Sequence, residues 1–315
     1  MMKKPLILIA GPTASGKTKT SVLLAKEVGG EVISADSMQI YKGMNIGTAK
    51  VKPEEMEGVP HYMIDEWEAN FPCSVATFKA KVEGYLEQIY AKGKIPILVG
   101  GTGFYLNAIL FDTQFDSIEA DTSYREVLEK RAQEEGALAL HKALEKVDPK
   151  AAADIHPNNI KRVVRALEYY EKTGKPISEH NQKEKEKRSM GESPYEYTFF
   201  ALTMARHTLY ERINLRIDQM LEEGLVDEVK YFYDMGLSED LPSMKAIGYK
   251  EFFPYFKGQL SLETCVNQLK QNTRNYAKRQ LTWFRHQATP VFIEVDKLNF
   301  DGHKITQRML EILKR

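Results

Sequence analysis

Cysteine is scarce in this chain of 315 residues, which contains only Cys73 and Cys265. The two lie far apart and form no CxxC pair. This argues against a disulfide framework and against a zinc site, and it is typical of a protein in a reducing cytoplasm. Long apolar runs are also missing, since none approaches the roughly 20 residues that a membrane-spanning helix needs. We therefore expect a cytoplasmic protein with no membrane association.

An excess of charge is absent as well, because 44 Lys and Arg residues balance 44 Asp and Glu residues. This balance excludes a globally basic nucleic-acid binder, although it leaves room for a local basic face. The share of hydrophobic residues, 43%, is ordinary for a globular protein and excludes a disordered or fibrous chain. The length predicts two domains, or one core with a large insertion.

The first informative motif is GPTASGKT at residues 11–18, directly after the apolar run LILIA at residues 6–10. A run that is apolar on both faces predicts a buried parallel strand, and helical spacing follows over residues 20–28. This context is that of a phosphate-binding loop (P-loop), whose backbone N–H groups surround a phosphate at the start of a helix. Lys17 would supply charge to the outer phosphate oxygens, and the Thr18 hydroxyl is placed for Mg²⁺. The predicted phosphate-binding residues are Gly11, Pro12, Thr13, Ala14, Ser15, Gly16, Lys17 and Thr18.

Two further strands predict an open α/β sheet of the P-loop NTPase type, with functional residues at the carboxyl ends of its strands. Residues 95–99 end in GGTG, where most P-loop nucleotidases have a metal-binding acid, and residues 31–35 end in Asp36. Asp36 would therefore assist the metal or accept a proton, unless it is only a helix or turn cap. Thr102 offers a hydroxyl within the GGTG turn, which is otherwise an ordinary link from strand to helix.

Between residues 112 and 196 strand-like runs vanish and helical spacing takes over, and strand character returns at residues 196–204. We expect this segment to be an all-helical insertion domain, and residues 1–111 with 197–315 to form the catalytic core. The charged run at residues 183–188 is expected to be a mobile segment. Within the insertion, Lys161 and Arg165 are four residues apart and share a helix face, which suits contact with a phosphate backbone. The alternative is a solvated helix face.

Two other groups of cations lie in the C-terminal third. Arg212 and Arg216 are stacked four residues apart and could close over a diphosphate, or could pair with nearby acids. Residues 273–286 contain Arg274, Lys278 and Arg279 with aromatic residues between them and no acid. Basic residues alternating with aromatics favour a nucleic acid, and the alternative is a helix that packs its aromatics on the sheet.

Taken in order, these motifs resemble those of the tRNA dimethylallyltransferases, also called tRNA isopentenyltransferases. The resemblance covers nearly the whole chain, and no zinc-finger extension of the eukaryotic kind follows, so the bacterial form is the better match. The matching stretches are GPTASGKT (11–18), SADSMQIY (34–41), GGTGFY (100–105), RVVRALE (162–168), AIGYKE (246–251) and AKRQLTWFR (277–285).

The resemblance implies transfer of a dimethylallyl group from dimethylallyl diphosphate to the N6 amine of adenosine 37, next to the anticodon in tRNA. It implies catalytic roles for Asp36 as proton acceptor, for Thr102 at the target nucleotide or at the phosphate side of the channel, and for Lys17 at the leaving diphosphate, with Mg²⁺ as cofactor. The target base would be turned out of the stacked anticodon loop. Lys161 stands where family members commonly have Gln, so we expect it to contact phosphate. The tRNA-contacting residues implied are Asp36, Ser37, Met38, Gln39, Thr102, Lys161, Arg162, Val163, Val164, Arg165, Arg274, Lys278 and Arg279.

Two other functions are compatible with parts of the sequence. A P-loop kinase for a small molecule or nucleotide would use the P-loop but leave both basic helices without a role. An RNA-binding protein without chemistry would leave Asp36 unexplained. We therefore expect a monomeric enzyme whose partners are dimethylallyl diphosphate and the anticodon stem-loop of tRNA.

Overall fold

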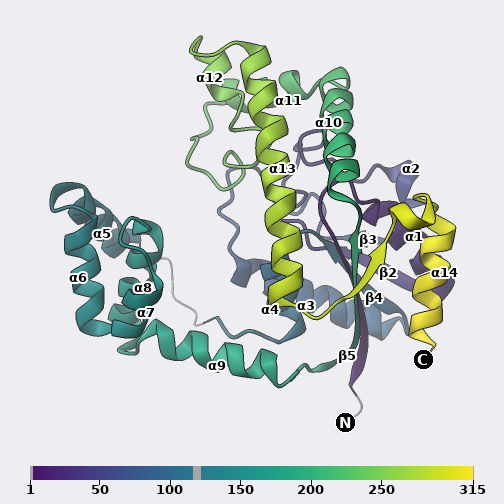
Figure 1. Ribbon diagram of the computed structural model, residues 1–315, viewed down its shortest axis with the longest axis horizontal. Coiled ribbons are helices and arrows are strands. Elements are labelled where there is room, and N and C mark those ends of the chain that lie inside the picture. The colour runs from purple at the N-terminus through teal and green to yellow at the C-terminus, as the bar shows by residue number, and fades with distance from the viewer. Residues whose placement is uncertain (1–2, 116–121, 315) are drawn as a thin grey trace. The chain divides into compact units, whose positions relative to one another are not determined.

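The computed structural model describes residues 3–115 and 122–314, and these form two compact units (Figure 1). One unit comprises Met1–Leu110 together with Pro194–Arg315, and the other is Phe111–Ser193. Within the described ranges, no helix combines the length and the apolar character that crossing a membrane requires.

A parallel sheet of six strands organises the first unit, with the order β3-β2-β4-β1-β5-β6. Every pairing between neighbouring strands is parallel. Because parallel strands place their carboxyl ends at the same edge, the segments that follow β1, β2 and β4 meet there. The strands are β1 (Lys4–Ala10), β2 (Gly30–Ser34), β3 (His61–Tyr62), β4 (Ile95–Gly100), β5 (Tyr195–Thr203) and β6 (Val291–Glu294).

Helices cover both faces of this sheet, with α1 beside α14 on one face and α3 beside α4 on the other (Figure 1). The core between these layers is apolar, because the last five residues of β1 and the last five of β4 are all buried. The long helices α10 and α13 lie side by side. The helices of this unit are α1 (Lys17–Val28), α2 (Pro53–Met56), α3 (Val75–Ala91), α4 (Gly103–Leu110), α10 (Arg206–Glu222), α11 (Leu225–Asp234), α12 (Phe253–Phe256), α13 (Leu262–Gln287), α14 (Gly302–Leu313) and the short 3-10 helix Asp296–Leu298.

The second unit is built from helices around its own hydrophobic core, which includes Leu140, Leu144 and Val163. The buried carboxylate of Asp148 joins two of its helices: it accepts the N–H of Ala151 at 3.0 Å, and the N–H and hydroxyl of Ser178 at 2.9 and 2.6 Å. The helices are α5 (Thr122–Glu134), α6 (Ala137–Val147), α7 (Pro149–Asp154), α8 (Ile160–Thr173) and α9 (Ile177–Ser189).

The α/β fold expected from the sequence is confirmed, with two differences in detail. Strands β3 and β6 were not predicted, because the first has two residues and the second is mostly exposed. The charged run at residues 183–188, for which no secondary structure was predicted, is part of helix α9. Pairs such as Gln182 with Glu186, whose side chains bond at 3.0 Å, stabilise a helix despite its polar composition.

Candidate active site

The P-loop lies between the end of β1 and the start of α1, as its strand–loop–helix context predicts. The Lys17 ammonium turns back onto this loop and donates to the carbonyl oxygens of Gly11 at 3.0 Å and Pro12 at 2.7 Å. The Ser15 hydroxyl donates to the same Pro12 oxygen at 2.8 Å, and this contact closes the turn. Burial lowers the pKa of Lys17 to about 8, although the negative charge of Asp36 opposes the shift. A buried ammonium beside backbone N–H groups is a site for a strongly anionic ligand.

Helix α10 brings both predicted arginines to this loop. The Arg212 Nε donates to the carbonyl oxygen of Ala14 at 2.9 Å, and its guanidinium lies 4.4 Å from the centre of the Phe300 ring. Burial lowers the pKa of Arg216, and the charges of Glu55 and Asp36 act in the opposite direction. Arg216 also helps to lower the pKa of Lys17, so these two cations share one electrostatic environment. Like charges gathered in this way favour a ligand with several negative charges.

Asp36 follows β2 and faces these cations. One of its carboxylate oxygens accepts the backbone N–H of Met38 at 2.9 Å, and its own N–H points to the Ser34 hydroxyl at 3.4 Å. This turn uses only part of the capacity of a carboxylate, which has about four lone-pair positions. The turn cap considered from the sequence is therefore present, and it is compatible with a second, chemical role.

A group of side chains that the sequence did not single out surrounds the GGTG turn after β4. Gln280, buried on α13, donates from Nε2 to the carbonyl oxygen of Gly101 at 2.9 Å and accepts the N–H of Thr13 at 3.3 Å. A Cβ atom on Gly101 would lie 2.2 Å from Gln280 Nε2, so a larger residue at this position would displace the Gln280 amide. One turn earlier on α13, Tyr276 lies near Thr102; burial raises the pKa of Tyr276, and the charge of Asp36 adds to the rise, while Thr102 lowers it.

These missed residues lie in the basic, aromatic stretch at residues 273–286 that was noted as a nucleic-acid signal. Gln280 and Tyr276 are four residues apart, a spacing that places both on one helix face. The periodicity of the stretch could have indicated an inward-facing side, but nothing local identifies the turn that it contacts. Thr102 thus lies beside α13, while Lys17, Arg216 and Asp36 share one electrostatic environment.

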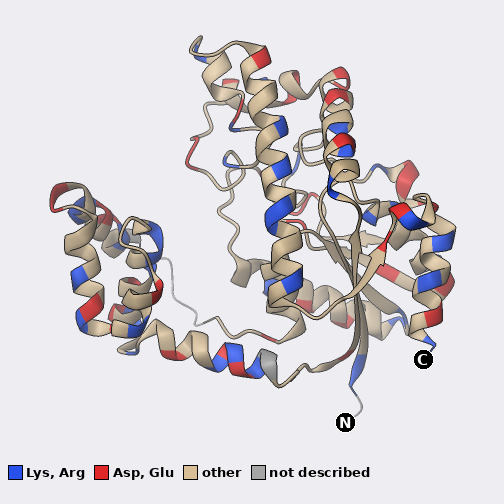
Figure 2. Cartoon of the chain, viewed as in Figure 1, with Lys and Arg blue, Asp and Glu red and all other residues tan. Residues whose placement is uncertain are grey.

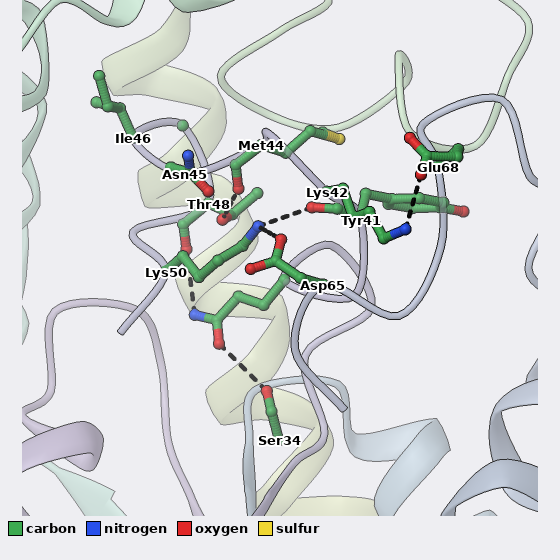
Figure 3. Close-up of polar contacts among 12 residues, drawn as sticks. Ser34, Tyr41, Lys42, Met44, Asn45, Ile46, Thr48, Lys50, Asp65 and Glu68 are labelled. Carbon is green, nitrogen blue, oxygen red and sulfur yellow. Dashed lines mark hydrogen bonds and ion pairs between the residues drawn. The ribbon is translucent and has the colours of Figure 1, made fainter. Parts of the chain in front are cut away.

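The segment after Asp36 folds into a compact loop held by its own polar contacts (Figure 3). The Gln39 Nε2 donates to the carbonyl oxygens of Thr48 and Ala49 at 3.3 and 3.2 Å, while its Oε1 accepts the Ser34 hydroxyl at 3.2 Å. The buried Lys50 ammonium donates to the carbonyl oxygen of Tyr41 at 2.7 Å and pairs with a carboxylate oxygen of Asp65 at 2.5 Å (Figure 3). The amide of Gln39 therefore organises this loop, and residues 36–39 are all partly exposed.

In the second unit, helix α8 presents the predicted cations on its surface. Lys161, Arg162 and Arg165 are exposed, whereas Val163 and Val164 are buried in the hydrophobic core of that unit. The two valines therefore support the helix from below, and only the three cations form a surface that a ligand can reach.

The cations of α13 differ from one another in their exposure to solvent. Figure 2 shows Lys and Arg recurring along this helix. Lys278 and Arg279 are exposed and line a surface groove of about 610 Å³ that also contains Trp283. Arg274 is half-buried and donates to the side-chain oxygen of Asn214 at 2.7 Å. A guanidinium carries five N–H donors, so this bond leaves Arg274 the capacity for a second contact.

A site with three or more His, Cys, Asp or Glu ligands for a metal is not found among residues 3–115 and 122–314. Mg²⁺ in phosphate sites commonly uses one or two protein oxygens, together with substrate phosphates and waters. The Thr18 hydroxyl and the Asp36 carboxylate are hard oxygen donors of that kind. The residues present therefore fit Mg²⁺ bound with a diphosphate, and they do not fit a metal held by protein alone.

Comparison with known proteins adds independent findings. The sequence profile of the family described as IPP transferase matches residues 39–287. The tRNA dimethylallyltransferase of Geobacillus thermodenitrificans is 52% identical over 313 residues, which cover 99% of this chain and 96% of that protein. The tRNA dimethylallyltransferase of Lachnoclostridium phytofermentans is 50% identical over 310 residues, which cover 98% and 97%.

Solved structures of the same family are also similar to this chain. A tRNA delta(2)-isopentenylpyrophosphate transferase from Staphylococcus epidermidis is similar with a TM-score of 0.73 at 42% identity, covering 99% of this chain and all of that one. A eukaryotic dimethylallyltransferase acting on tRNA gives a TM-score of 0.82 at 31% identity, covering 98% of this chain and 78% of that one. These matches leave the kinase and the purely RNA-binding alternatives without support.

Proposed function

Because the chain belongs to the IPP transferase family and has tRNA dimethylallyltransferase activity, we propose a specific division of labour among its residues. The group transferred is the dimethylallyl group of dimethylallyl diphosphate, and the acceptor is the N6 amine of adenosine 37 in the anticodon loop. The product is N6-(dimethylallyl)adenosine. The observation that carries this proposal is that the P-loop after β1, whose carbonyl oxygens bind Lys17 and Arg212, and Asp36 after β2 lie at the same edge of the parallel sheet.

The P-loop side holds the diphosphate that leaves. As the bond between the dimethylallyl carbon and the diphosphate oxygen breaks, the electron pair stays on that oxygen. Lys17 and Arg216 stabilise this growing negative charge, and Arg212 supports the P-loop through its bond to Ala14. Positive charge that is already in place needs no reorganisation during the reaction, which makes such stabilisation effective.

The Thr18 hydroxyl would hold Mg²⁺ together with the diphosphate, as its oxygen chemistry allows. When bound, Mg²⁺ supplies positive charge to the phosphate oxygens. In the substrate-bound enzyme, Lys17 would leave the carbonyl oxygens of Gly11 and Pro12 and turn to a phosphate oxygen.

The Asp36 side handles the nucleophile. An adenine amine attacks weakly, so a carboxylate that accepts its proton while the N–C bond forms lowers the barrier. The turn formed with Met38 fixes the orientation of Asp36, and Thr102, which lies near Tyr276, contacts the target nucleotide. The adenine is turned out of the anticodon loop to reach this position.

The exposed cations on the two basic helices bind the tRNA backbone. Lys161, Arg162 and Arg165 do so on the insertion domain, and Lys278 and Arg279 do so on α13, with Arg274 contributing a further contact. The valines at 163 and 164 contribute by packing α8 onto its core. We propose that the enzyme works as a monomer in the cytoplasm.

The direct test incubates the protein with radiolabelled dimethylallyl diphosphate and an anticodon stem-loop RNA, with Mg²⁺ present. We expect label in the RNA and a mass increase of one dimethylallyl group, and both should vanish when adenosine 37 is replaced by guanosine. Equal labelling of the guanosine RNA would contradict the assigned acceptor.

A further inference from the structure

A carboxylate on helix α11 holds the backbone of the loop at residues 43–50. Glu228 accepts three successive backbone N–H groups, those of Asn45 at 2.9 Å, Ile46 at 2.7 Å and Gly47 at 2.9 Å. Successive N–H groups that converge on one anion form a concave backbone site. In this protein the anion is a side chain, so the loop conformation depends on α11.

Tyr249 completes the arrangement. Its hydroxyl donates to Glu228 at 2.5 Å, so each carboxylate oxygen accepts two hydrogen bonds. A Cβ atom at Gly47 would lie 2.5 Å from the Tyr249 ring, which means that the loop backbone rests directly on this ring. Burial raises the pKa of Tyr249, and the charge of Glu228 raises it further, so the hydroxyl stays protonated and remains a donor.

The same loop is tied at its other side to the turn that contains Asp36. The Gln39 amide bonds to the carbonyl oxygens of Thr48 and Ala49 and to the Ser34 hydroxyl. A continuous chain of hydrogen bonds therefore runs from α11 through the loop to the segment at residues 34–39. The P-loop contacts described above do not belong to this chain.

We propose that Glu228 is a positioning residue for the tRNA half of the reaction, because it fixes the loop at residues 43–50 and, through Gln39, the segment that contains Asp36. This inference rests on the roles proposed above for residues 36–39. It follows that a change at Glu228 should affect the reaction with tRNA but not the binding of dimethylallyl diphosphate. Loss of the Glu228 contacts displaces the residues that meet the target nucleotide, while the diphosphate site keeps its geometry.

The test compares Glu228→Gln with Asp227→Asn, an exposed carboxylate one position earlier on the same helix. Glutamine keeps the shape of Glu228, but its NH₂ group cannot accept the hydrogen bonds that one carboxylate oxygen now accepts. A small misplacement of reacting groups is costly, so we expect kcat/KM for tRNA to fall by about 10- to 100-fold. We expect the KM for dimethylallyl diphosphate to stay within about twofold, and Asp227→Asn to match the wild type.

Tyr249→Phe provides a second variant, because it removes one of the four hydrogen bonds and leaves the ring that supports Gly47. We expect a smaller fall in kcat/KM for tRNA and again an unchanged KM for dimethylallyl diphosphate. If Glu228→Gln does not fold, the test is made with Tyr249→Phe. The inference is overturned if kcat/KM for tRNA in these variants equals that of the wild type. It is also overturned if the KM for dimethylallyl diphosphate rises by as large a factor as kcat/KM for tRNA falls. Should the wild type itself transfer no label to tRNA, the proposed function fails first and the inference falls with it.

Discussion

Gln280 and Gly101 are separated by 179 positions in the chain, yet the side-chain amide of one donates to the carbonyl oxygen of the other at 2.9 Å. Because the same amide also accepts the N–H of Thr13, a single side chain connects the P-loop to the GGTG turn. In the proposed mechanism these two segments serve different substrates. In that mechanism, Gln280 would set the spacing between the leaving group and the target nucleotide.

We expect Gln280→Met, which keeps the length but removes both hydrogen bonds, to lower kcat by about 10- to 100-fold. Gln271→Met, on the exposed side of the same helix, should leave kcat unchanged. Steady-state kinetics with both substrates, together with melting temperatures, would measure this. A fall in melting temperature with unchanged kcat would show that Gln280 only stabilises the fold.

Asp36→Asn tests the proton acceptor. The substitution keeps the shape and a hydrogen-bond acceptor for Met38 but removes the charge, so we expect kcat to fall by at least about 100-fold. Binding of tRNA, measured by filter retention, should change little. If activity returns at high Mg²⁺ concentration, Asp36 is instead a metal ligand, and the proton must go to water or to the diphosphate.

The pKa of Lys17 predicts how donor binding depends on pH. Burial lowers this pKa from its ordinary value of 10.5 to about 8, so the ammonium is mostly charged at pH 7 and mostly neutral at pH 9. Since the charged form binds the diphosphate, we expect affinity for dimethylallyl diphosphate to fall by roughly tenfold between these pH values. Lys17→Met should bind weakly at both. Equal affinities of the wild type at pH 7 and pH 9 would contradict this role.

The free energy of unfolding should rise with pH, whereas the affinity for dimethylallyl diphosphate falls. Between pH 8 and 10.5 the unfolded chain binds more protons at Lys17 than the folded protein does. The free energy of unfolding contributed by this residue therefore rises with pH across that window. Urea unfolding of the substrate-free wild type and of Lys17→Met isolates this contribution as the difference between the two pH profiles. If the difference in the free energy of unfolding between the two proteins stays constant from pH 8 to 10.5, the pKa of Lys17 is not lowered by folding.

The salt dependence of tRNA binding tests the exposed cations. A protein that neutralises phosphates loses affinity as salt rises, with a slope of roughly −0.7 in the logarithmic plot for each contact with a single strand. Arg165→Gln should flatten this slope by about one such increment, whereas Lys304→Gln, an exposed cation on α14, should not. An unchanged slope for Arg165→Gln would show that Arg165 contacts no phosphate and that this face of α8 is only solvated.

The sequence predicted those parts of the protein that have a local signature. Strands β1, β2 and β4 were found because each is an apolar run, and the P-loop was found because phosphate binding needs a contiguous motif. Gln280 and Glu228 were missed because their partners lie about 180 residues away. Val163 was assigned with its charged neighbours from the motif, but its burial follows from how α8 packs on its own core.

The pairing of β1 with β5 has a consequence for how the chain is made. Lys4 lies opposite Tyr195, so one edge of the first strand stays unpaired until nearly two thirds of the protein has been synthesised. At a synthesis rate of about 5–20 residues per second, that wait lasts on the order of ten seconds or longer. An unpaired edge in the middle of a future sheet is open to wrong partners throughout that time. A nascent chain that stops within the helical insertion therefore exposes this edge, and the phosphate site is completed only after the whole insertion has been translated.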